Sequence, residues 1–155
     1  LENGIISLSP QRTALQPLLQ SIAEQYAAKA AEKGLSLQLH DTDIFATFDS
    51  KWTAEALANI VDNAIKYTEH GTITISAESY EMFARSDISD TGSGISENEQ
   101  SKIFARFYRS KNVREQEGVG IGLYLARQII SGEGGYIKVA SVPGKGSTFS
   151  VFLPK

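Results

Sequence analysis

The segment Leu57–Tyr67 is typical of a helix with one apolar side and one polar side of unusual composition. At about 3.6 residues per turn, Asn59, Asn63, Lys66 and Tyr67 fall on one face. The opposite side is aliphatic, which predicts packing on a hydrophobic core. Asn is a poor helix former, so an ordinary solvated face, the alternative interpretation, does not favour two of them. Amide oxygens suit Mg²⁺ and an ammonium suits phosphate, so this face indicates half of a nucleotide site.

Ten of the thirteen glycines lie between Gly92 and Gly146. The first cluster is Asp90-x-Gly92-x-Gly94, which follows an extended-looking run. Its glycines let the backbone turn sharply and approach a flat ligand. Its carboxylate can accept a hydrogen bond from an exocyclic amine such as that of adenine. The alternative is an ordinary turn capped by Asp.

The second cluster, Gly118-x-Gly120-x-Gly122, runs into a strong helical pattern. Glycines at a helix N-terminus expose N–H groups that can hold phosphate oxygens. A dinucleotide fingerprint is excluded, because a strand must precede its glycines and Lys111–Glu117 is charged and nearly devoid of apolar residues.

A P-loop is also excluded. In Gly144-Lys145-Gly146 the lysine is followed by glycine, not by the Ser or Thr that a P-loop requires. This segment is better interpreted as a tight turn between the alternating strands Tyr136–Val142 and Thr148–Leu153.

Composition bounds the class of protein. The 155 residues are 41% hydrophobic, which suits one globular domain with a real core. The net charge of −3 gives no reason to expect nucleic acid as a partner. There is no cysteine and no apolar run near about 18 residues, so we expect no disulfide framework and no membrane span in this segment.

The remaining pattern predicts an α+β fold, a two-layer α/β sandwich with a mixed sheet of about five strands and three main helices. A capping box at Thr13-x-x-Gln16 predicts the start of the first helix. The helices are expected at 13–33, 51–67 and 121–131, with a short helical piece at 97–104. The strands are expected at 35–40, 45–48, 71–79, 82–89, 136–142 and 148–153.

Together these motifs resemble the catalytic, ATP-binding domain of bacterial two-component sensor histidine kinases, in the superfamily that includes gyrase-type ATPases. Asn59–Tyr67 resembles the N box and Asp90–Gly94 the G1 box. Phe104–Arg109 resembles the F box and Gly118–Leu123 the G2 box. Gly144–Phe149 resembles the final glycine turn, and the five occur in the family order.

The resemblance implies a Bergerat-type fold that binds ATP and Mg²⁺. Residues 1–10 would end a preceding dimerisation helix and linker, and 11–155 would form the catalytic domain, with an ATP lid at about 91–118. Its partners would be the histidine-bearing dimerisation domain of the same full-length protein and, through that domain, a response regulator. We expect the chain to be a monomeric fragment from the cytoplasmic portion of an inner-membrane sensor kinase.

The resemblance also implies roles for single residues. Asn59, Lys66 and Arg109 would be catalytic, Asn63 would bind the metal, and Asp90 would bind the adenine amine. The nucleotide-binding residues that it implies are Asn59, Asn63, Lys66, Tyr67, Asp90, Gly92, Gly94, Ile95, Phe107, Tyr108, Arg109, Gly118, Val119, Gly120, Ile121, Gly122, Leu123, Ser147 and Thr148.

One position separates members of the superfamily. Gyrase-type hydrolases carry Glu where this chain has Asn59, which cannot take a proton from water. Glu55, one turn earlier, is an alternative base. The substitution favours transfer to histidine over hydrolysis. Neither His40 nor His70 lies in the helical setting that the family's phosphoacceptor requires, so the acceptor is expected outside this chain.

Two other function classes stay open: a gyrase-like ATPase or anti-sigma-type serine kinase, and a non-catalytic nucleotide-binding module.

One position predicts a polar residue within the hydrophobic core. Ser86 occupies an alternation slot beside Ala84 and Ile88 where the family usually has a large aliphatic residue. Its hydroxyl therefore needs a buried partner.

Overall fold

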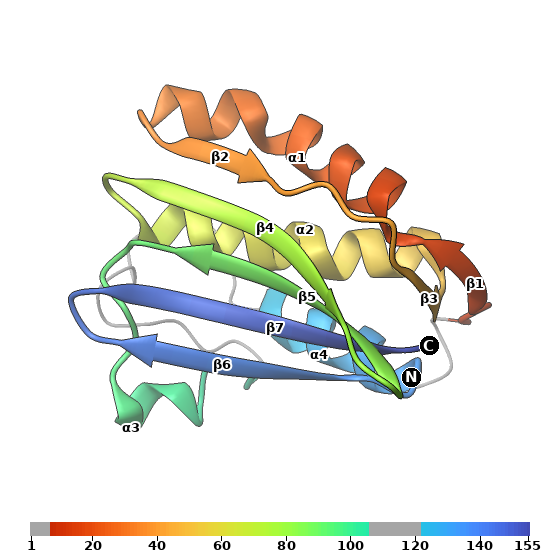
Figure 1. Ribbon diagram of the computed structural model, residues 1–155. Helices are drawn as coiled ribbons and strands as arrows, with labels where there is room; N and C mark the ends of the chain where they lie inside the picture. The colour runs from red at the N-terminus through yellow and green to blue at the C-terminus, as the bar shows by residue number, and fades with distance from the viewer. Residues whose placement is uncertain (1–6, 106–121) are drawn as a thin grey trace.

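A five-stranded mixed sheet forms one layer of the protein (Figure 1). The computed structural model describes residues 7–105 and 122–155. The strand order is β2-β4-β5-β7-β6, with β2 parallel to β4 and the other neighbours antiparallel. The strands are β2 (Ser36–Leu39), β4 (Thr72–Ser79), β5 (Phe83–Asp90), β6 (Tyr136–Val142) and β7 (Gly146–Pro154). The sequence prediction of a mixed five-stranded sheet is confirmed.

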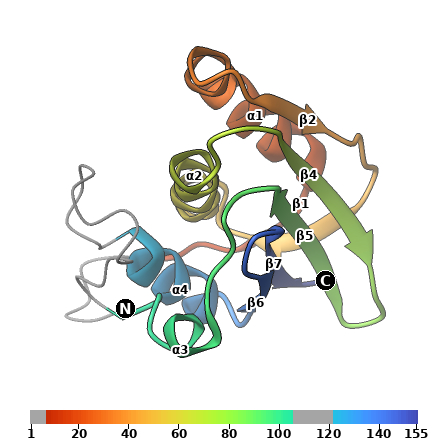
Figure 2. The same ribbon diagram turned by 90° about the vertical axis from the view of Figure 1, so that its left-hand side faces the viewer.

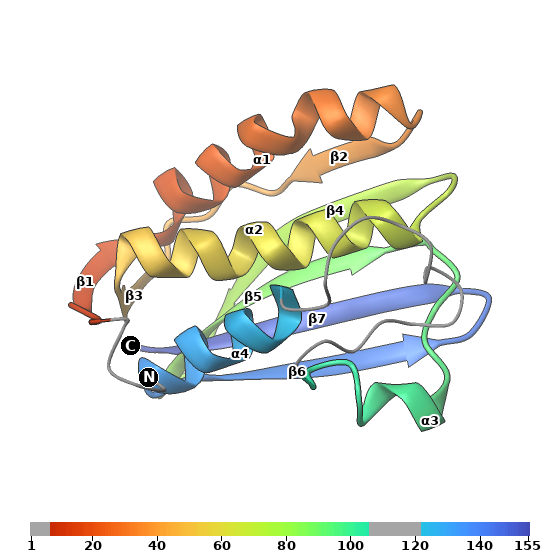
Figure 3. The same ribbon diagram turned by 180° about the vertical axis from the view of Figure 1, so that it is seen from behind.

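Helices form the second layer, which confirms the predicted two-layer α+β sandwich. The helices α2 (Ser50–Tyr67) and α4 (Gly122–Gly132) cover one face of the sheet (Figure 3). The helix α1 (Leu15–Glu32) packs against α2 and β2. A single short turn, α3 (Glu97–Gln100), lies near one end of the sheet.

The core lies between the two layers. In β7 buried and half-buried residues alternate, as expected for a strand with one covered face. The same alternation in β5 places Ala84, Ser86, Ile88 and Asp90 on the helix side. The aliphatic side of α2 faces them, because Leu57, Ile60, Val61, Ala64 and Ile65 are all buried.

The start of the domain differs from the prediction. Residues Gln11–Ala14 form a strand, β1, which pairs antiparallel with β3 (Phe45–Phe48) in a separate two-stranded sheet. The predicted capping box is wrong. The Thr13 hydroxyl donates to the carbonyl of Gln11, and Gln16 donates to Asp41 instead of the helix start.

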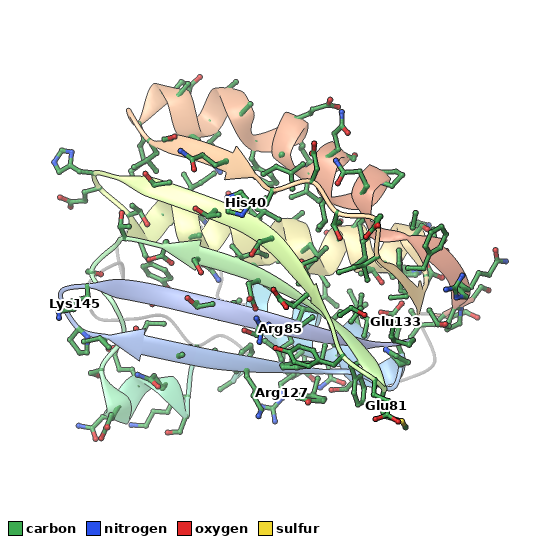
Figure 4. The ribbon with its side chains drawn as sticks, viewed as in Figure 1. His40, Glu81, Arg85, Arg127, Glu133 and Lys145 are labelled. Carbon is green, nitrogen blue, oxygen red and sulfur yellow. The ribbon has the colours of Figure 1, made fainter. Side chains whose placement is uncertain are left out.

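A buried carboxylate network joins the start of α2 to the end of α4. Asp49 caps α2 by accepting from the Trp52 N–H, and its own N–H donates to Glu133 over 2.6 Å. The hydroxyl of Thr53 also donates to Glu133, over 2.8 Å. Burial raises the pKa of Glu133, and these hydrogen bonds oppose the rise. The network lies toward the right-hand end of the molecule in Figure 4 and fixes α4 beside α2.

The buried Ser86 has the partner that its position requires. It is 1% exposed, and its hydroxyl lies 3.4 Å from the carbonyl oxygen of Ser76 on the neighbouring strand β4. The hydrogen bond is long, so it offsets only part of the cost of burying the hydroxyl.

Candidate functional site

Three chain segments far apart in the sequence meet at one end of the sheet. They are the end of α2, the end of β5 and the turn between β6 and β7, all at the left of Figure 1 and toward the viewer in Figure 2. Lys145 marks the turn in Figure 4. Because the sheet alternates, Asp90 enters this corner from the helix side, beside the end of α2.

Asp90 is held by backbone amides. It is 8% exposed, and its Oδ1 accepts from the N–H of Gly92 over 2.9 Å and from the N–H of Ser147 over 3.3 Å. Burial raises the pKa of Asp90, and the two amides oppose the rise. A fixed carboxylate at the edge of a corner is a suitable acceptor for an exocyclic amine.

Gly92 packs too closely for any side chain. A Cβ placed there would lie 2.6 Å from the carbonyl oxygen of Tyr67. It would also lie 2.8 Å from Thr68 Oγ1 and 3.0 Å from Asp90 Oδ1. The glycine therefore lets the chain after β5 pass directly against the end of α2.

The structure gives a reason for glycine at position 94 that differs from the one expected from the sequence, the close approach of a flat ligand. It has a φ of 74°, and a Cβ there would lie 2.4 Å from the carbonyl oxygen of Val142. The position that a Cβ would occupy faces the β6–β7 turn. The glycine is thus required by packing between two protein segments, whether or not a base also lies close.

The polar face of α2 is formed as predicted. Asn59, Asn63, Lys66 and Tyr67 are all half-buried on it. Asn59 reaches the start of α4, since a Cβ on Gly122 would lie 3.6 Å from the Asn59 side chain. The structure therefore brings the first N-box residue to the last glycine of the second cluster.

Lys66 has a carboxylate partner that the sequence analysis missed. Its Nζ lies 3.2 Å from Oδ2 of Asp62, whose other oxygen accepts from Lys29. Burial alone would raise the pKa of Asp62, but the hydrogen bond from Lys29 and the charge of Lys66 hold it below the ordinary value. The signal was present in the sequence, because Asp62 stands four residues before Lys66.

The two residues that follow Gly146 point in opposite directions. The buried Ser147 lies on the Asp90 side, and its hydroxyl is 2.8 Å from that of Ser141. Thr148 is turned to the other face of the sheet, where its hydroxyl is 2.8 Å from that of Ser89. The structure therefore does not bring Thr148 to the group around Asp90.

The remaining site residues are only partly described. Ile95 is half-buried, and its N–H donates to Ser141 over 2.7 Å. Leu123 is buried in the core at the start of α4. Phe104, the first F-box residue, packs edge-to-face on Phe149 at 6.2 Å. Outside the described residues lie Phe107, Tyr108, Arg109, Gly118, Val119, Gly120 and Ile121, together with the rest of segment 106–118 of the predicted lid and residues 1–6.

The donor set of α2 fits Mg²⁺. Asn63 offers a carboxamide oxygen, and Mg²⁺ commonly takes one or two protein oxygens together with phosphate and water. In 7–105 and 122–155 no three His, Cys, Asp or Glu side chains gather as a metal cage. A single Asn is therefore suited to a metal that arrives with its phosphates.

The other candidate side chains are exposed. His40 follows β2 and is exposed (Figure 4). His70 is exposed in the turn between α2 and β4, where its carbonyl accepts from the Thr91 hydroxyl over 3.4 Å. Glu55 is exposed on α2, where its charge acts on Tyr26 of α1.

One buried residue of the corner was not singled out from the sequence. Thr68 ends α2 beside Asp90 and Gly92 and is 0% exposed. A threonine at a helix end is common and gives no distinctive signal.

None of the helices in the described part of the chain is both long and apolar enough to cross a bilayer.

A known family model matches most of the chain. The model is described as histidine kinase-, DNA gyrase B-, and HSP90-like ATPase, and it covers residues 48–155. The sensor histidine kinase AtsR of Burkholderia thailandensis is 35% identical over 156 residues, which are 96% of this chain and 26% of that protein. The chain spans 13% to 41% of the length of its known relatives.

Solved structures share the fold. The catalytic domain of the histidine kinase ThkA, in a nucleotide-free form, superposes with a TM-score of 0.82 at 26% identity. That alignment covers 95% of this chain and 96% of the ThkA domain. Full-length ShkA in complex with AMPPNP gives a TM-score of 0.84 at 26% identity, over 96% of this chain and 32% of ShkA.

Proposed function

Because the chain belongs to the histidine kinase-, DNA gyrase B- and HSP90-like ATPase family, we propose that it is the ATP-binding catalytic domain of a sensor histidine kinase. In this role it transfers the γ-phosphoryl group of Mg-ATP to a histidine on a separate dimerisation domain. The bond from the γ-phosphorus to the bridging oxygen breaks, an imidazole nitrogen bonds to phosphorus, and ADP leaves.

The observation that carries the proposal is the position of the Asp90 carboxylate beside the C-terminal end of α2, next to Thr68 and Gly92. Its Oδ1 is already occupied by two backbone N–H groups, which fix the carboxylate. The Asp90 carboxylate accepts from the adenine amine, and the base then lies at the end of α2. The phosphates extend along the helix toward Asn59 and Gly122, where a Cβ on Gly122 would lie 3.6 Å from the Asn59 side chain.

Two residues of the α2 face, Lys66 and Asn63, then have charge-related tasks. Lys66 lies against the phosphates and offsets part of their charge. To do so it leaves its ion pair with Asp62. Asn63 would hold Mg²⁺, which would neutralise charge on the phosphate oxygens. Phosphoryl transfer requires mainly positioning and charge stabilisation, so the site needs no nucleophile of its own.

Asn59 favours transfer over hydrolysis. A carboxamide cannot accept a proton from water near neutral pH, whereas an imidazole acceptor needs little activation. Glu55, exposed one turn before Asn59, stays the alternative base. The proposed partners are the dimerisation domain and, through it, a response regulator. The proposed location is the cytoplasmic side of the inner membrane.

Labelled ATP tests this proposal. The chain is incubated with Mg²⁺ and [γ-³²P]ATP, with and without a supplied helical domain that carries the acceptor histidine. Acid-labile label should appear on that domain only when both proteins are present. With ATP alone, neither His40 nor His70 should be labelled. Release of free phosphate without labelling would favour an ATPase, and binding without either reaction would favour a non-catalytic module.

A further inference from the structure

The hydroxyl of Thr68 is buried without a hydrogen-bond partner in the described part of the chain. The residue is 0% exposed. Polar groups buried in this way are rare, and leaving one unpaired is unfavourable. Valine has the same shape without the hydroxyl and would fill the same space. The presence of an unpaired hydroxyl at this position therefore calls for a partner in another state of the protein.

The Asp90 carboxylate lies close to this hydroxyl. Thr68 Oγ1 and Asp90 Oδ1 both border the point where a Gly92 side chain would begin, at 2.8 Å and 3.0 Å. Because Gly92 has no side chain, nothing bulkier than its backbone separates the two groups. Thr68 is fixed by the end of α2, where its N–H donates to the carbonyl of Ile65.

Asp90 has unused hydrogen-bonding capacity. Within the described residues, its protein donors are the N–H groups of Gly92 and Ser147, and both meet Oδ1. A carboxylate accepts about four hydrogen bonds in all. Oδ2 is thus available to the adenine amine. A donor held beside the carboxylate would keep it oriented while Oδ2 meets the base.

We propose that Thr68 is a positioning residue for adenine recognition, whose hydroxyl donates to the Asp90 carboxylate in the nucleotide-bound protein. The buried side chain acts through Asp90 and does not touch the base. This inference rests on the proposed function, in which Asp90 accepts from the adenine amine. Thr68 would then be a second residue, beside Asp90, that determines the preference for 6-aminopurines over purines that lack the amine.

The test compares ADP with purine riboside 5′-diphosphate, which differs only by the missing amine. Calorimetry gives the ratio of the two dissociation constants for the wild-type chain, Thr68→Val and Thr68→Ser. The matched control is Ser86→Ala, which removes another buried hydroxyl from the same strand as Asp90. Thermal unfolding of each variant without nucleotide is measured in parallel.

Thr68→Val should reduce the preference for ADP about tenfold, the size expected for one hydrogen bond to a charged group. Its unfolding temperature should stay equal or rise, because the hydroxyl is unpaired without ligand. Thr68→Ser and Ser86→Ala should keep the wild-type preference. A merely structural role would change the unfolding temperature and leave the preference unaltered.

An unchanged preference in folded Thr68→Val would overturn the inference. If that variant does not fold, Thr68→Ser decides, because loss of the preference despite the retained hydroxyl would equally overturn it. Failure of the underlying proposal looks different. A wild-type chain that binds neither diphosphate, or binds both equally, would remove the role of Asp90 and this inference with it.

Discussion

Lys66 and Asp62 form an ion pair one turn apart on α2, with 3.2 Å between Nζ and Oδ2. The ammonium that we assign to the phosphates is therefore shared with a carboxylate on its own helix. The same carboxylate also holds Lys29 of α1. A phosphate that takes up Lys66 has to compete with this pair.

Asp62→Asn should strengthen ADP binding about threefold, because half-exposed ion pairs contribute up to about 1 kcal/mol. The measurement is calorimetry at low ionic strength. The control is Lys29→Met, which removes the other partner of Asp62 and should bring no gain. Weaker ADP binding by Asp62→Asn would show that Asp62 orients Lys66 for the phosphates and does not compete with them.

Asn63→Ala should weaken binding of ATP in the presence of Mg²⁺ and have less effect on metal-free ATP. The reason is that the carboxamide oxygen is assigned to the metal and not to the nucleotide. Two calorimetric series, one with Mg²⁺ and one with EDTA, separate these contributions. Equal losses in both series would remove Asn63 as the metal ligand.

Gly146→Ala should destabilise the protein by about 2–4 kcal/mol, through overpacking and backbone strain together. Gly146 has a φ of 129°, and a Cβ there would lie 2.0 Å from the backbone oxygen of Asp90. Gly144→Ala is the matched control. That residue also has a positive φ, 83°, but no atom lies within 4 Å of its Cβ position. It should lose only about 1–2 kcal/mol.

Urea unfolding of both glycine variants gives the two free energies. Because Gly146 packs beneath Asp90, its substitution should also weaken ADP binding, whereas Gly144→Ala should bind normally. Equal destabilisation by the two substitutions would mean that the close approach to Asp90 does not matter.

The preference for ADP over its amine-lacking analogue should depend on pH through Asp90. The carboxylate must be ionised to accept from the amine, and burial raises its pKa above the ordinary 3.8. The preference should therefore be complete at neutral pH and disappear as the pH falls through this raised pKa. Using the ratio of the two ligands cancels the titration of their phosphates. A ratio that stays constant while Asp90 becomes protonated would contradict the assignment.

The same shift has a consequence for stability. A carboxyl whose pKa is raised by folding favours the folded state when protonated, and this contribution is lost as the pH rises through the folded pKa. Asp90 is therefore ionised at neutral pH at some expense of stability. Asp90→Asn should leave the domain folded, since the amide keeps the shape of the neutral acid.

The elements with strong periodicity could be predicted from the sequence, and weak local signals could not. The alternation in β5 and β7 and the apolar side of α2 follow from burial of one face, so their positions were predicted to within a few residues. In contrast, β1 is only four residues long and owes its existence to pairing with β3. Such a partner is distant in the sequence, and the local capping pattern at Thr13 pointed elsewhere.

The candidate site shows the same division. The shared face of Asn59 and Asn63 follows from helix geometry alone. Thr68 could not be identified, because its importance depends on Asp90, which lies on another element. Thr148 was grouped with its neighbour Ser147, although successive strand residues point to opposite faces. Tertiary contacts, and not residue type, decide such positions.

The most direct measurement of the central claim is calorimetry of ADP binding to the wild-type chain and to Asp90→Asn, with circular dichroism to establish that both are folded. The account predicts clear binding by the wild type. It predicts that the variant binds ADP at least about tenfold more weakly. The reason is that the charged carboxylate that accepts from the adenine amine is replaced by a neutral amide. Unchanged ADP affinity in a folded Asp90→Asn variant would contradict the account.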